Sequence, residues 1–85
     1  MKSIKLSEYP NDGILIDLED NYSYQQWHDK RAINIPYNEL IYNFATLLDK
    51  SKKYYVYCRR GSKSRRLASI LEIYNYDVTQ VLLDN

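Results

Sequence analysis

Residues 54–64 read YYVYCRRGSKS, and the change of character after Cys58 decides the fold. Tyr54 to Cys58 is a run of β-prone residues, which favours a strand. The next six residues contain a glycine, two serines and three cations, and cannot continue that strand. From Ser64 onward, helical spacing relates the apolar residues Leu67, Ile70, Leu71 and Tyr74. The sequence therefore predicts a strand, a tight loop and a helix, which Asn75 can close in a left-handed conformation.

The segments on either side repeat this alternation of strand and helix. Further strands are expected over residues 3–6, 14–18, 32–36 and 78–83. A short helix is expected over residues 22–29, with Trp27 in the core. A second helix should begin after Asn38 as its N-cap, because the apolar residues that follow share one face: Leu40, Ile41, Phe44, Leu47 and Leu48. The alternation predicts an α/β domain with a mainly parallel sheet.

Length, charge and cysteine content narrow the class of protein. Eighty-five residues make one domain, residues 1–85. The net charge of +1 argues against a strong attraction to nucleic acid or to an anionic membrane. A single cysteine allows no internal disulfide and no cysteine-rich metal site, and no apolar segment approaches the roughly 20 residues of a membrane span. A cytoplasmic protein with a reduced thiol and no cofactor or metal is expected.

Cys58 is the strongest candidate for a reactive group. It ends a predicted parallel strand, and functional groups in such sheets gather at the carboxyl ends of the strands. A loop that curls over a helix N-terminus directs several backbone N–H groups inward, which stabilises a thiolate. The alternative is a buried cysteine that acts as a small apolar residue. The Gly61 turn, the serines and the local cluster of cations favour the nucleophile: Arg59, Arg60, Lys63, Arg65 and Arg66.

Four motifs resemble those of rhodanese-like sulfurtransferases. CRRGSKS at residues 58–64 resembles the active-site loop C-R-x-G-x-R-S, with Lys63 where arginine is common. HDKRAINIP at residues 28–36 is similar to G-H-I-P-G-A-I-N-I-P, ILIDL at 14–18 to L-I-D-V-R, and NYDVTQV at 75–81 to G-Y-x-V-x-x-L. The resemblance spans about residues 3–83. It implies a three-layer rhodanese-like domain with a small, mainly parallel sheet flanked by helices.

The resemblance also implies a chemistry and a set of site residues. Cys58 would take a sulfane sulfur from a donor such as thiosulfate, hold it as a persulfide and pass it to a thiol or protein acceptor. The backbone N–H groups of residues 59–64 would cradle the outer sulfur, with the Ser62 and Ser64 hydroxyls as further donors. Arg59 and Lys63 would orient the anionic donor. Arg60, Arg65 and Arg66 would steer it from further away, or are simply solvated charges.

Three polar residues outside the loop are also candidates for a role near the site. Asp17 can hydrogen-bond backbone near the site or can be a plain strand-end carboxylate. His28 is expected to be structural, and Asn34 is expected to bond nearby backbone.

The chain departs from the family pattern in several places. The arginine expected two residues after Asp17 is absent, and Glu19 stands there. The usual helix between the first two strands, the Gly-Gly pair after the last strand and any C-terminal helix are also absent, so the fold is expected to be trimmed at both ends.

Three other functions fit parts of the sequence. A cysteine phosphatase requires C-x5-R, but the sixth residue after Cys58 is Ser64, and Tyr57 stands where phosphatases usually have histidine. A non-catalytic or sulfur-relay binding module fits the small size and the missing elements. Nucleic-acid binding through the basic cluster and its neighbouring tyrosines is disfavoured by the near-zero net charge. Pairing of two copies of the chain stays open.

Overall fold

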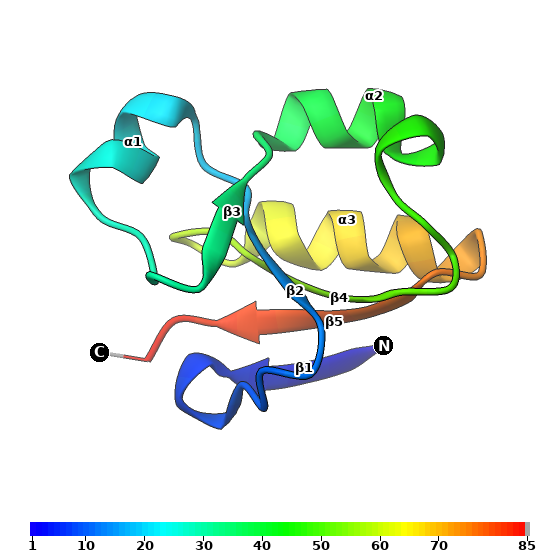
Figure 1. The fold of residues 1–85 in the computed structure, drawn as a ribbon, viewed down its shortest axis with the longest axis horizontal. Helices are drawn as coiled ribbons and strands as arrows, with labels where there is room; N and C mark the ends of the chain where they lie inside the picture. The colour runs from blue at the N-terminus through cyan, green and yellow to red at the C-terminus, as the bar shows by residue number, and fades with distance from the viewer. Residues whose placement is uncertain (85) are drawn as a thin grey trace.

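The computed structural model describes residues 1–84 and contains one parallel sheet (Figure 1). Its strands are β1 (Lys2–Lys5), β2 (Ile14–Asp17), β3 (Ala32–Asn34), β4 (Lys53–Tyr57) and β5 (Asp77–Leu82), in the order β1-β5-β4-β2-β3. The helices are α1 (Asn21–Gln26), α2 (Tyr37–Leu47) and α3 (Ser62–Ile73), and a single 3-10 turn, η1 (Leu6–Glu8), separates β1 from β2. The predicted α/β class with a mainly parallel sheet is confirmed.

The register of the sheet brings the ends of β2 and β4 to the same level. Asp17 at the end of β2 lies opposite Tyr57 at the end of β4. The Leu18 N–H then donates to the Tyr57 carbonyl at 2.9 Å, which continues the pairing beyond the two strands. Cys58, Asp17 and the residues just after Asp17 therefore meet at the carboxyl edge of the sheet.

The two faces of the sheet build two separate parts of the core. Alternate residues of β4 point to opposite faces, as the pleat requires. Tyr54, Val56 and the adjoining Cys58 pack with residues of α2 and α3, including Leu40 and Leu67. On the other face, Tyr55 and Tyr57 pack with the side chains of Tyr9, Leu15, Ala32 and Val81.

A thin layer covers the second face. Tyr9, which follows η1, packs its ring edge against Tyr55 with 4.9 Å between ring centroids. The segment after α1 reaches over Tyr57, because the Asp29 N–H donates to the Tyr57 hydroxyl at 3.1 Å. The sequence predicted that no full helix connects the first two strands, and the structure has only the short turn η1 between them. The sheet thus lies between α2 and α3 on one face and this thin layer on the other, which is the three-layer arrangement predicted from the motifs.

Several predicted boundaries shift by one or two residues. α2 begins at Tyr37 with Pro36 as its N-cap rather than after Asn38. Proline suits that position because its fixed φ is compatible with helix entry and its missing N–H is not needed there. α3 begins at Ser62 instead of Ser64, and β4 ends at Tyr57, so that Cys58 is the first residue of the loop.

The prediction that Trp27 lies in the core is wrong. Trp27 follows the end of α1 at Gln26 and is 46% exposed, with its ring centroid 6.2 Å from that of Tyr57. The Arg59 guanidinium covers one face of the ring at 5.7 Å from its centroid.

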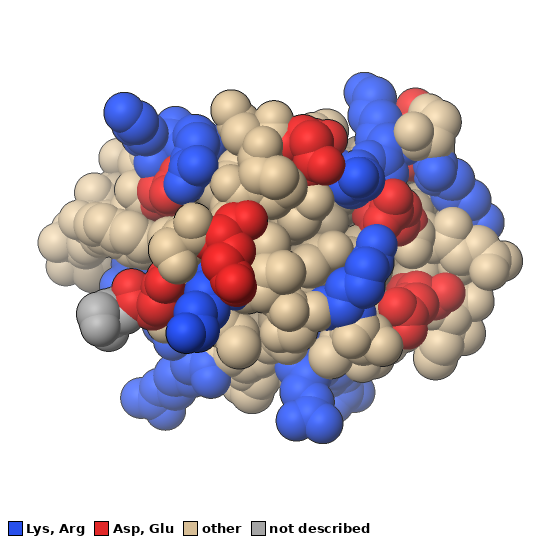
Figure 2. Space-filling view, turned by 90° about the horizontal axis from the view of Figure 1, so that it is seen from below, with Lys and Arg blue, Asp and Glu red and all other residues tan. Residues whose placement is uncertain are grey.

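Charged residues of both signs are mixed over the surface. Figure 2 shows basic and acidic side chains interspersed on the face seen from below. Among residues 1–84, no helix is long and apolar enough to cross a membrane.

Candidate active site

The Cys58 sulfur receives two backbone hydrogen bonds from its own loop. The N–H groups of Gly61 and Ser64 point at Sγ at 3.2 and 3.3 Å. The Ser64 hydroxyl lies 3.5 Å from the same atom. Cys58 is 2% exposed and borders a pocket whose other lining residues are Glu19, Arg59, Arg60, Ser62 and Lys63. Two backbone N–H groups at the N-terminus of α3 thus converge on the one sulfur atom of the loop.

Gly61 makes this arrangement sterically accessible. It is the N-cap of α3 and has a φ of +85° and a ψ of −18°, a left-handed conformation that side-chain-bearing residues rarely adopt. A Cβ at this position would meet no atom closer than 3.8 Å, so the need for glycine comes from the backbone angles rather than from crowding. The turn aims the Gly61 N–H back at Cys58.

Gln80 of β5 hydrogen-bonds the loop through its side chain. This residue was not identified from the sequence. Its buried side-chain amide donates to the Gly61 carbonyl at 2.9 Å and to the Ser64 Oγ at 3.0 Å. The Ser64 hydroxyl also lies 3.1 Å from the Gly61 carbonyl. Because Gln80 already satisfies that carbonyl, the Ser64 O–H can turn toward the sulfur when Cys58 is ionised. Gln80 therefore positions Gly61 and Ser64, the two residues whose N–H groups point at Sγ.

Replacing Gln80 with methionine should loosen this loop. The variant keeps most of the side-chain volume but removes both hydrogen bonds, and we expect a loss of about 1–3 kcal/mol in the free energy of unfolding. We also expect Cys58 alkylation by iodoacetamide at pH 7 to slow several-fold. Urea titration and alkylation kinetics measure the two effects. Thr79→Val is the matched control, because Thr79 is buried on the opposite face of the same strand. Equal alkylation rates in both variants would contradict the positioning role.

Arg59 does not direct its guanidinium at the thiol. Its Nη2 donates to the carbonyls of Ser23 and Trp27, at 2.8 and 3.1 Å, which lie at the C-terminal end of α1. This carbonyl end carries the negative pole of a helix, where cations are favourable. The Arg59 side chain thus ties α1 to the active-site loop, instead of presenting its donors to a substrate as the sequence suggested.

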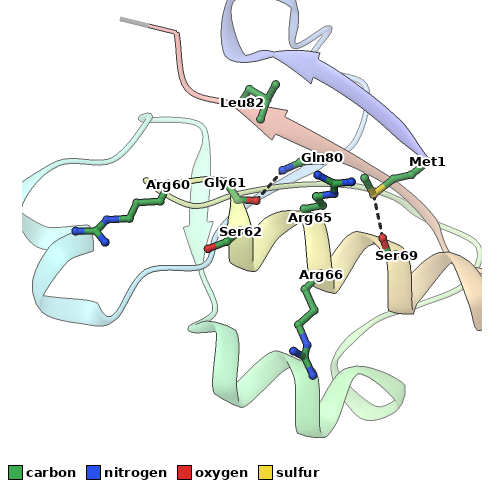
Figure 3. A pocket seen from close by; sticks show the side chains of 9 residues that line it. All are labelled: Met1, Arg60, Gly61, Ser62, Arg65, Arg66, Ser69, Gln80 and Leu82. Carbon is green, nitrogen blue, oxygen red and sulfur yellow. Dashed lines mark hydrogen bonds between the residues drawn. The ribbon is translucent and has the colours of Figure 1, made fainter.

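The other cations of the loop lie on two different sides. Lys63 and Ser62 border the Cys58 pocket together with Arg60. Arg60, Arg65 and Arg66 also line an adjoining groove over β5. In Figure 3, the Arg60 and Arg66 side chains extend away from Gly61, whereas Gln80 reaches toward it.

Asp17 organises the backbone next to the loop. Its Oδ1 accepts the Glu19 N–H at 2.8 Å, and the side chain is fully buried. Asn34 donates from Nδ2 to the carbonyls of Asp17 and Glu19, at 3.1 and 2.8 Å, which confirms its predicted role in backbone bonding. Of the two readings of Asp17, the geometry supports the backbone-bonding one.

Burial sets the ionisation of the groups beneath the site. Desolvation raises the pKa of the Asp17 carboxyl, and no hydrogen bond of standard length reaches its Oδ2. Burial also raises the pKa of the Tyr57 hydroxyl, with the nearby Asp17 and Asp29 carboxylates adding to the effect. Tyr57 therefore stays protonated at neutral pH.

His28 has a structural position. Its Nδ1 lies 2.7 Å from the Tyr24 carbonyl, and its ring stacks on that of Tyr24 at 3.7 Å between centroids. Among residues 1–84, no group of three or more His, Cys, Asp or Glu side chains is arranged to hold a metal ion.

Comparisons with known proteins agree with this fold and loop. The profile of the rhodanese-like domain matches residues 4–84. The tRNA sulfurtransferase of Thermoplasma acidophilum is 36% identical over 62 residues, which cover 73% of this chain and 12% of that protein. The chain thus spans only a small part of this curated relative.

Two solved structures are similar over most of the chain. A rhodanese-related protein from Thermoplasma volcanium superposes with a TM-score of 0.83 and 25% identity, covering 95% of this chain and 83% of its own. Reduced CoADR-RHD of Bacillus anthracis superposes with a TM-score of 0.74 and 31% identity, covering 84% of this chain and 13% of that one.

The parallel sheet and the cysteine loop over the start of α3 define an α/β domain of the rhodanese type. With the family profile matched over residues 4–84, the chain belongs to the rhodanese-like family.

Proposed function

We propose that residues 1–85 act as a sulfurtransferase domain in which Cys58 carries the transferred sulfur. The observation that carries the proposal is the position of Sγ, which accepts two N–H hydrogen bonds at the N-terminus of α3 and borders a pocket open to solvent. Family membership and the similarity to a tRNA sulfurtransferase support sulfur transfer in general.

The reaction has two displacement steps at sulfur. The Cys58 thiolate attacks the outer sulfur of a donor, either thiosulfate or a persulfide. The S–S bond of the donor breaks, and sulfite or a thiolate leaves with the electron pair, so that Cys58 becomes a persulfide. A thiolate or cyanide acceptor then attacks the outer sulfur of that persulfide, and the Cys58 thiolate is released. No net oxidant or reductant is consumed.

The loop supplies the residues for these steps. The backbone N–H groups of Gly61 and Ser64 hold Sγ, and the Ser64 Oγ lies 3.5 Å from the same atom, where it accepts from the thiol. The Ser62 hydroxyl and the Lys63 ammonium border the pocket and can contact the outer sulfur and the anionic part of the donor. Arg60 and Arg65 act at longer range by attracting anions, and Arg59 acts by fixing the loop to α1.

A transfer assay tests the proposal. The purified protein is incubated with thiosulfate or glutathione persulfide as donor and cyanide as acceptor, and thiocyanate is measured. We expect thiocyanate to form catalytically with at least one donor, and none to form after alkylation of Cys58 with iodoacetamide. Absence of turnover with both donors in the untreated protein would contradict the proposal.

A further inference from the structure

We propose that Glu19 selects the class of sulfur donor, by disfavouring doubly charged inorganic anions such as thiosulfate relative to singly charged persulfides carried on a thiol. The proposal rests on the sulfurtransferase function of Cys58 described above. It follows from the position of an acidic side chain at the mouth of a site that is otherwise built to attract anions.

The Glu19 carboxylate is part of the pocket. It borders the same hollow as Cys58 and Lys63. Its Oε2 accepts the Arg59 N–H at 2.8 Å, the first N–H of the loop after the cysteine. This N–H was expected to help cradle the outer sulfur, but it is occupied by the carboxylate. The site therefore has one donor fewer, and a negative charge stands in its place.

Three hydrogen bonds hold Glu19 in this position. Its N–H is held by Asp17 Oδ1 at 2.8 Å, and its carbonyl is held by Asn34 Nδ2 at 2.8 Å. Asp17 is fully buried, so the backbone of Glu19 is anchored to the interior of the sheet. With the carboxylate bonded to the Arg59 N–H as well, the charge is placed before any donor arrives.

The surrounding cations only partly offset this charge. The Arg59 guanidinium is bonded to carbonyls of α1 and lies over Trp27. Arg60 borders the pocket, although its side chain extends away from Gly61 (Figure 3). Lys63 borders the pocket, but it also interacts with the Asp20 carboxylate, whose pKa is lowered first by the Ser23 N–H hydrogen bond and further by Lys63. Because Coulomb repulsion is proportional to the charge of the incoming anion, a dianion loses twice as much as a monoanion.

Alkylation with a charged and a neutral reagent measures this selection directly at Cys58. Iodoacetate and iodoacetamide react at the same sulfur but differ in charge, so the ratio of their rate constants reports the local potential. Glu19→Gln removes the charge and keeps an oxygen that can accept the Arg59 N–H. We expect the iodoacetate-to-iodoacetamide ratio to rise about threefold to tenfold in this variant at low salt, and less at high salt. Glu72→Gln is the matched control. Glu72 lies on α3 about 15 Å along the helix from Ser62, which borders the pocket.

Sulfur transfer tests the donor class itself. In Glu19→Gln, the kcat/KM for thiosulfate should rise about threefold to tenfold relative to that for the persulfide of 2-mercaptoethanol, whose only charge is on sulfur. An unchanged alkylation ratio, or an equal rise in Glu72→Gln, would overturn the proposal. Turnover with both donors but no change in their ratio would also overturn it. If wild type transfers sulfur from neither donor, the proposed function fails, whereas the alkylation ratio still decides whether Glu19 selects by charge.

Discussion

Cys58→Ser should lose sulfur transfer by at least about 10³-fold in kcat. A serine hydroxyl at this position is not ionised near neutral pH, and an oxygen atom cannot carry the sulfur as a persulfide. Serine is slightly smaller than cysteine and can accept the Gly61 and Ser64 N–H groups that now point at Sγ. The loop should therefore persist, and the loss should fall on the chemical step. Thiocyanate formation and the far-UV circular dichroism spectrum measure the two expectations.

A second hydroxyl on the same helix provides the control. Ser69 of α3 lies beyond the loop, and its hydroxyl contacts Met1 Sδ at 3.3 Å rather than Cys58. Ser69→Ala should keep the activity of the wild type. Residual transfer above about one per cent in Cys58→Ser would mean that another group accepts the sulfur, which contradicts a Cys58 persulfide.

Leu67→Ala should strongly reduce the free energy of unfolding. The Leu67 side chain is fully buried between the helix and the sheet, in the same cluster as Val56 and Leu71. Truncating a buried leucine to alanine costs about 2–5 kcal/mol, because apolar contacts are lost and a cavity remains. The free energy of unfolding of a domain of this length is expected to be about 4–13 kcal/mol. The variant should therefore lose a large part of it.

Urea titration by fluorescence measures this loss. Ile73, on the same helix, is 76% exposed, and Ile73→Ala should change the free energy of unfolding by no more than about 0.5 kcal/mol. Equal midpoints for the two variants would show that α3 does not pack on the sheet as described.

The strand, loop and helix around Cys58 could be predicted because their signals are local. A β-prone run, a glycine with a positive φ and a helical repeat of apolar residues follow one another within twenty residues of the sequence. The same holds for the parallel sheet, since the apolar run at β2 and the alternation of elements need no tertiary information. The boundaries of α2 and α3 shifted because Pro36 and Gly61, rather than the nearest polar residue, start these helices.

The parts of the site that depend on strand register could not be predicted in this way. Gln80 is near the loop only because β5 pairs with β4 and Gln80 lies opposite Val56. β2 pairs with the edge of β4 that faces away from β5, and Asp17 lies opposite Tyr57. Only this pairing brings Glu19 within reach of the Arg59 N–H. Arg59 looked like a substrate ligand in the sequence, whereas α1 places two backbone carbonyls within its reach.

The intact mass of the protein after exposure to a sulfur donor tests the central claim most directly. The reduced protein is incubated under anaerobic conditions with thiosulfate or glutathione persulfide, desalted, and analysed by mass spectrometry before and after treatment with cyanide. We predict a gain of one sulfur atom that maps to Cys58, is removed by cyanide and is absent in Cys58→Ser. No gain with either donor, or an adduct at a residue other than Cys58, would contradict the assignment of Cys58 as the sulfur carrier.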